Sequence, residues 1–88
     1  MNKEEKIYEL YSLIKLYGFK EIKKTKCLDG KYKLVAQQIY YFADGNPNCS
    51  RVQLVNAIQK IFFNILRFSI DESYAVVIAM FVQDLLKI

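Results

Sequence analysis

The 88-residue sequence contains no histidine and few of the residues that build turns or metal sites. Histidine is the commonest general base and the commonest metal ligand, so its absence removes the usual route to both kinds of site. Three glycines and one proline are too few for the many turns of a β-sandwich or barrel. A glycine-rich phosphate loop is also missing. We therefore expect few, long elements and a protein that is not an enzyme and uses no cofactor.

The two cysteines do not indicate a metal site or a disulfide. Cys27 and Cys49 lie 22 residues apart with no second pair, which argues against zinc. Two cysteines in a cytosolic protein seldom form a lasting disulfide, so we interpret both as reduced thiols. Neither has a histidine to act as a base.

Long apolar runs and targeting signals are missing as well. The longest unbroken apolar run, from Tyr74 to Val82, has nine residues, whereas a membrane span needs about 20. The first residues, Met-Asn-Lys-Glu-Glu-Lys, do not resemble a signal peptide. We expect one cytoplasmic domain comprising residues 1–88.

What the chain does have is a local concentration of positive charge. Residues 15–33 carry seven lysines against two acids, a net charge of +5, while the remainder sums to −1. This distribution is typical of a surface that faces an anion, although a solvated loop that keeps an apolar protein soluble would look the same. The candidate anion-contacting or membrane-contacting residues are Lys20, Lys23, Lys24, Lys26, Lys31 and Lys33.

The N-terminal part predicts a helix from Lys3 to Tyr17, because apolar residues recur at spacings of three and four. Asn2 is placed to cap its first turn, and Gly18 is a typical left-handed helix stop. The residues expected to face the core are Ile7, Leu10, Tyr11, Ile14 and Tyr17; Tyr8, Leu13 and Leu16 lie off this stripe.

Residues 19–33 are ambiguous. We favour a basic linker followed by a helix from Lys31 to Ala43, which ends at the sequence Asp44-Gly45-Asn46-Pro47. The alternative is a β-hairpin about an Asp29-Gly30 turn, although Asp29 would serve equally well as a helix N-cap. The expected inward residues of this second helix are Leu34, Val35, Gln38, Ile39 and Phe42.

Two long apolar helices are predicted in the C-terminal half, from Arg51 to about Phe68 and from Ile70 to Lys87. Short connections favour antiparallel neighbours, so the predicted fold is an all-α, antiparallel four-helix bundle with up-and-down connections. The last helix is apolar almost all round, which is typical of a central helix or an interface. The expected core residues are Leu54, Val55, Ile58, Ile61, Phe62, Ile65 and Phe68, then Tyr74, Ile78, Phe81 and Leu85.

Both C-terminal helices begin with a capping-box pattern, Ser50 with Gln53 and Ser69 with Glu72. In such a box the serine hydroxyl accepts a backbone N–H bond, and the Gln or Glu side chain reaches back to the cap. Asp71 and Glu72 are also adjacent carboxylates. We interpret them as first-turn acids that favour the helix dipole, not as a catalytic pair.

Nucleic-acid binding is an alternative function that the basic segment raises. Its lysines are interleaved with Tyr17, Phe19 and Tyr32, which could stack on bases. No predicted helix, however, has the polar, arginine-rich face of a helix-turn-helix recognition helix. We therefore rank nucleic-acid binding, including a phage-borne regulator, below protein binding.

Three stretches carry a family resemblance. They are the opening helix Ile7-Tyr-Glu-Leu-Tyr-Ser-Leu-Ile14, the junction Ala43-Asp-Gly-Asn-Pro47 followed by Leu54-Val-Asn-Ala-Ile58, and the link Leu66-Arg-Phe-Ser-Ile-Asp-Glu72. Together they resemble the immunity proteins that protect bacteria from pediocin-like bacteriocins, the enterocin A immunity type.

The resemblance implies a non-catalytic four-helix bundle that confers antimicrobial resistance at the inner membrane face. Its implied partner is a sugar-uptake permease engaged by the bacteriocin. Contact through the C-terminal region points to Arg67, Val76, Met80 and Lys87 as candidate partner-contacting residues. The basic segment would suit an anionic membrane surface. A helical module that forms a homodimer through the last helix is a further alternative.

Overall fold

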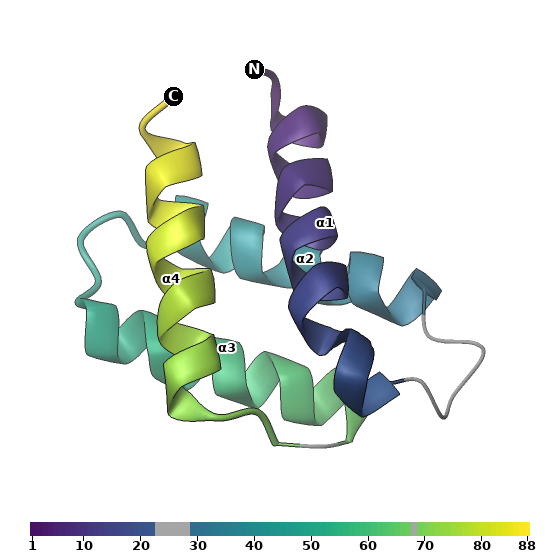
Figure 1. Ribbon diagram of the computed structural model, residues 1–88. Coiled ribbons are helices and arrows are strands. Elements are labelled where there is room, and N and C mark those ends of the chain that lie inside the picture. The colour runs from purple at the N-terminus through teal and green to yellow at the C-terminus, as the bar shows by residue number, and fades with distance from the viewer. Residues whose placement is uncertain (23–28, 68) are drawn as a thin grey trace.

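The computed structural model contains four helices and describes residues 1–22, 29–67 and 69–88, with the side chains of residues 17–22 and 29 left out. The helices are α1 (Lys3–Ile22), α2 (Asp29–Gly45), α3 (Arg51–Leu66) and α4 (Glu72–Leu86). In Figure 1, α1 and α4 run in opposite directions, as do α2 and α3, and the first pair lies across the second. The predicted all-α, antiparallel four-helix bundle is confirmed.

The core lies between these two helix pairs and draws on all four helices. The last helix, α4, packs against each of the other three helices, which agrees with its apolar composition. Helix α2 also packs against each of the other three. The radius of gyration is 12.0 Å. A packed chain of this length has a value of about 12 Å, so the chain is as compact as a folded domain of its size.

The first helix begins as predicted but ends later than predicted. The Oδ1 atom of Asn2 accepts a bond from the Glu5 backbone N–H at 2.8 Å, which caps the first turn. The prediction that Gly18 ends the helix is wrong, because α1 continues to Ile22. A glycine costs about 1 kcal/mol relative to alanine inside a helix, and good helix formers follow it here.

The second helix begins at Asp29, two residues before the predicted start, and continues to Gly45. The β-hairpin alternative is wrong, because Asp29, Gly30 and the lysine-rich residues after them are helical. The predicted linker is therefore too long at both ends, and residues 23–28 lie outside the described part of the chain. At the other end, the Asn46 side-chain amide donates to the Phe42 carbonyl oxygen at 2.8 Å and caps the last turn.

The inward face of α2 differs from the predicted one. Val35 and Ile39 are buried and Phe42 packs half-buried against the core, as predicted, but Leu34 and Gln38 are exposed, so the prediction is wrong at these two positions. Alanines allow close packing where larger side chains would not fit, and the two tyrosines fill the space beside them. The buried residues of this helix are Tyr32, Val35, Ala36, Ile39, Tyr40 and Ala43.

The third helix has the capping box that its sequence predicts. The Gln53 backbone N–H donates to the Ser50 hydroxyl at 3.2 Å, and the Ser50 N–H donates to the Gln53 side-chain oxygen at 2.9 Å. The helix ends at Leu66, and Arg67 follows in the left-handed conformation with φ 64°. Its N–H donates to the Phe63 carbonyl oxygen at 2.9 Å, which completes the turn.

The predicted capping box of the last helix is wrong. Helix α4 begins at Glu72, and its N-cap is Asp71, which makes no side-chain cap bond. Ser69 therefore lies two residues before the cap position, where its hydroxyl cannot serve the first turn. Among the described residues, no helix has both the length and the apolar character that a membrane span requires.

Candidate functional site

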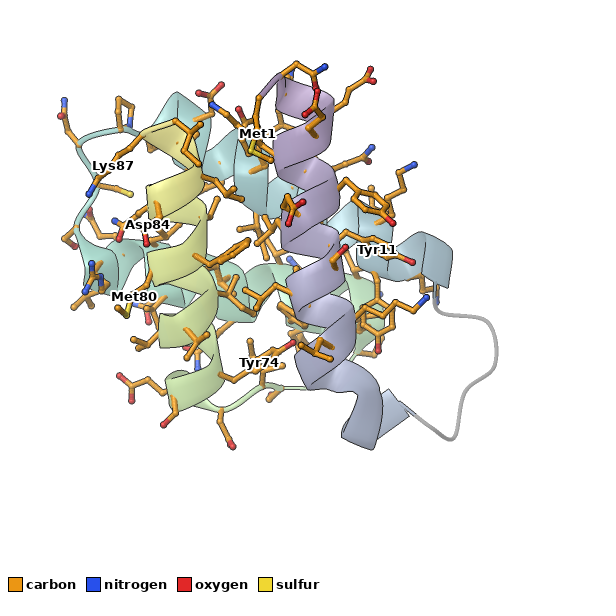
Figure 2. The ribbon with its side chains drawn as sticks, turned by 45° about the horizontal axis from the view of Figure 1, so that its top comes forward. Met1, Tyr11, Tyr74, Met80, Asp84 and Lys87 are labelled. Carbon is orange, nitrogen blue, oxygen red and sulfur yellow. The ribbon has the colours of Figure 1, made fainter. Side chains whose placement is uncertain are left out.

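The partner-contacting residues predicted on α4 fall on one side of that helix. Met80 is 45% exposed and Lys87 is exposed, and Figure 2 shows both, with Asp84 between them, on the side of α4 away from α1. Val76 lies one turn before Met80 but is half-buried and packs against the core. Val77 is the more exposed of the two valines. We call Val77, Met80, Asp84 and Lys87 the α4 outer face.

Arg67, the fourth predicted contact, lies apart from this face. It occupies the corner after α3, where its side chain is exposed. It is the only non-glycine residue with positive φ among the described residues. An exposed arginine with this unusual backbone conformation thus marks the junction into the last helix.

The structure describes only part of the predicted basic segment. Lys31 and Lys33 are exposed in the first turns of α2. Lys20 belongs to the last turns of α1, but its side chain lies outside the described part, as do Lys23, Lys24 and Lys26. Tyr32, proposed as a base-stacking residue, is 3% exposed and belongs to the core. Its burial removes one of the three aromatic residues on which the nucleic-acid alternative depends.

A hollow of about 690 Å³ lies between α1 and α2, and the sequence did not predict it. A second hollow of about 650 Å³ shares Tyr8 and Tyr11 with the first and continues along α1 to Lys15 and Leu16. The described residues that line the second hollow all belong to α1, so it extends the first hollow along that helix. We call the two together the α1–α2 groove. Figure 2 shows Tyr11 projecting from α1 on the side away from α4, toward the N-terminal part of α2.

Tyrosines and lysines line the groove from both helices. On the α2 side, Tyr41 is 48% exposed, and the Lys3 ammonium of α1 lies 4.2 Å from its ring centroid. On the α1 side, the Tyr8 and Tyr11 ring centroids are 6.0 Å apart at an interplanar angle of 50°. These contacts lie in the range of cation–π and tilted aromatic pairs, so they fix the rings and the ammonium group relative to one another.

A second lysine–tyrosine pair extends this pattern along α1. The Lys15 ammonium donates to the Tyr11 hydroxyl at 3.5 Å and lies 5.7 Å from its ring centroid. Lys33 lines the groove from α2, so one member of the predicted basic segment does contribute to it. Lys3 and Lys33 form no ion pair with a described carboxylate, and Glu4 is the acidic residue among the described lining residues. The described lining therefore carries net positive charge.

A third hollow, of about 350 Å³, lies where the α2–α3 connection meets the end of α4. Here Arg51 donates from Nε and Nη2 to the Gln83 side-chain oxygen at 3.3 and 3.2 Å, which joins α3 to α4. Cys49 is a free, half-buried thiol that packs against the core at this end. These contacts have a structural role and bring no reactive groups together. Cys27 lies outside the described residues.

No group of three or more His, Cys, Asp or Glu side chains in the described ranges is placed to hold a metal ion. Asp71 and Glu72, the adjacent carboxylates, lie at the cap and in the first turn of α4, and both are exposed.

Sequence reasoning missed the groove because its residues come from two helices. Tyr8 and Leu16 were recognised only as lying off the core stripe, and Tyr41 and Lys3 were not singled out. One signal was nevertheless present. Tyr8, Ser12, Lys15 and Leu16 recur at helical spacing outside the apolar stripe.

Comparison with family models, with curated proteins and with solved structures gives no match to this chain. The function must therefore be argued from the residues and surfaces themselves.

Proposed function

We propose that this chain is a non-enzymatic binding protein of the bacteriocin-immunity kind, acting in the cytosol at the inner membrane face. The observation that carries the proposal is the α4 outer face, where Val77 and Met80 are exposed and Lys87 follows. These two apolar side chains and the charged residues beside them form a mixed surface that a partner could cover, and methionine adapts readily to different partner surfaces. The partner in this proposal is a membrane permease with its bacteriocin bound.

The bundle supports the proposal in a second way. The resemblance implies four antiparallel helices and a short link into the last one, and the chain has both. Fold alone does not specify function, so this agreement adds only compatibility. Arg67 is exposed at that link, before the start of α4, and in this proposal it adds a charged contact separate from the α4 outer face.

The basic residues would have a supporting role. Lys31 and Lys33 are exposed near the start of α2. Each lysine close to an anionic leaflet contributes about 1 kcal/mol of attraction, so a few of them would hold the bundle near the membrane without inserting it. In this proposal the lysines position the protein, and α4 selects the partner.

The test is protection of a sensitive bacterial strain. Cells expressing the chain are challenged with a panel of pediocin-like peptides, and survival against at least one peptide is expected. The double variant Met80→Glu/Lys87→Glu should abolish protection because it removes the apolar contact and reverses the charge. Val52→Glu, on an exposed position of α3, is the matched control and should keep protection. Unchanged killing across the whole panel would count decisively against the proposal.

A homodimer through α4 is a second candidate, since the same two exposed apolar side chains could meet their copies. Light scattering over a range of protein concentrations separates the two candidates. A monomer at high concentration removes the dimer, and a dimer that Met80→Glu dissociates supports it.

A further inference from the structure

The α1–α2 groove has two walls that each present an exposed tyrosine. Tyr8 is 63% exposed on α1 and Tyr41 is 48% exposed on α2. Tyrosine offers a large, rigid contact area with a polar tip and little rotamer entropy to lose, which is why it is enriched at protein interfaces. We infer that this groove binds an acidic segment of a partner protein, with apolar side chains seated between the rings and carboxylates paired with the lysines.

The lysines of the lining indicate that the ligand carries negative charge. Lys3 and Lys33 stand on opposite walls, and neither forms an ion pair with a described carboxylate. Lys3 is held over the Tyr41 ring at 4.2 Å, so its ammonium group is already positioned at the wall. A cation–π contact at an exposed site is weak, but it biases the Lys3 ammonium group toward this wall before a carboxylate arrives. Glu4 lies in the same lining and disfavours acids only at its own end of the groove.

The length of the groove indicates how long the bound segment is. The lining runs along α1 from Lys3 to Leu16. At about 1.5 Å per residue this stretch spans roughly 20 Å. A segment of about six residues fits that distance when it is extended, at roughly 3.3 Å each. A helical segment needs about 13 residues, which could present acids and leucines at alternating turns.

The contacts favour a peptide over a nucleic acid. Base stacking needs open aromatic faces, but the Lys3 ammonium lies over the Tyr41 ring, and Lys15 approaches the Tyr11 ring at 5.7 Å. Among the described lining residues, Glu4 also places a negative charge where a phosphate chain would run. A flat membrane surface would not fill a concave groove between two helices.

This inference goes beyond the proposed immunity function and does not depend on it. In Figure 2, Tyr11 projects to the side of the molecule opposite to the α4 outer face, where Met80 lies. The two surfaces can therefore be altered separately. The Met80→Glu/Lys87→Glu variant should leave groove binding unchanged.

The experiment selects ligands without assuming their sequence. A displayed library of random 14-residue peptides is panned against the purified full chain, and enriched peptides are synthesised with a fluorescent label. We expect them to combine Asp or Glu with Leu, Phe or other apolar residues. Their affinity, measured by fluorescence anisotropy, should fall at least tenfold in the variant Tyr8→Ser/Lys33→Glu. Both positions are exposed, so the fold should persist, as circular dichroism and the melting temperature will show.

The charge-matched control is Lys60→Glu, an exposed lysine of α3 outside the groove. It should leave peptide affinity within twofold of the parent chain. The inference is overturned if no peptides enrich, if the enriched peptides are not acidic, or if the groove variant binds them as well as Lys60→Glu does. It is also overturned if a 15-nucleotide dT strand or phosphatidylserine vesicles bind through Tyr8 and Lys33 while acidic peptides do not.

Discussion

The hydroxyl of Tyr74 donates a hydrogen bond to the backbone carbonyl oxygen of Ile14 at 3.0 Å, which joins the first turn of α4 to the middle of α1. The two residues are 60 positions apart in the chain. Figure 2 shows Tyr74 reaching from α4 to α1. The Tyr74 ring also meets Phe62 of α3 edge-on, with centroids 5.9 Å apart. A single side chain thus ties three helices together at one end of the bundle.

Removing this hydroxyl should weaken the bundle measurably. We expect Tyr74→Phe to lower the free energy of unfolding by about 1 kcal/mol, because the ring contact stays and one intramolecular hydrogen bond is lost. In a domain of this size such a loss lowers the melting temperature by about 4–8 °C. Tyr8→Phe, at an exposed tyrosine, is the control and should have the same melting temperature as the parent chain. Equal melting of both variants would show that the bond contributes nothing.

The two serines that precede the C-terminal helices give a second prediction. Ser50→Ala should cost about 1 kcal/mol, because it removes the hydroxyl that accepts the Gln53 N–H bond. Ser69→Ala should leave the free energy of unfolding within a few tenths of a kcal/mol, since Asp71 is the N-cap of α4. Urea denaturation of both variants measures the difference. If Ser69→Ala costs as much as Ser50→Ala, the start of α4 at Glu72 is incorrect.

The corner at Arg67 gives a third prediction. A non-glycine residue pays about 1–2 kcal/mol for the left-handed conformation, while glycine adopts it freely. Arg67→Gly should therefore raise the free energy of unfolding by up to about 1 kcal/mol, the gain being reduced by the greater freedom of the unfolded chain. Arg67→Ala keeps the penalty and should not stabilise. If the immunity proposal holds, Arg67→Gly should produce a more stable protein that protects less well.

Sequence patterns predicted the helices better than the faces that they bury. Periodicity and the Asn2 and Ser50 caps identified where α1 and α3 begin, because these are local signals between neighbouring residues. The predicted end of α1 at Gly18 was too early, because a glycine permits a helix to end but does not require it. The predicted core face of α2 differs from the observed one, because whether Leu34 or Tyr32 is buried depends on where α1 and α3 lie. The groove was missed for the same reason.

Two adjacent phenylalanines in α3 differ in burial. The difference supplies the last prediction. Phe62 is 1% exposed and meets Tyr74, whereas Phe63 is 49% exposed. Phe62→Ala should cost about 3–5 kcal/mol, because it leaves a cavity in the core. A chain of 88 residues has a total stability of roughly 4–13 kcal/mol, so this variant should lose a large part of its stability. Phe63→Ala removes the same atoms from the surface and should cost less than about 1 kcal/mol. Urea denaturation followed by circular dichroism compares the two, and equal losses would mean that α3 turns a different face to the core.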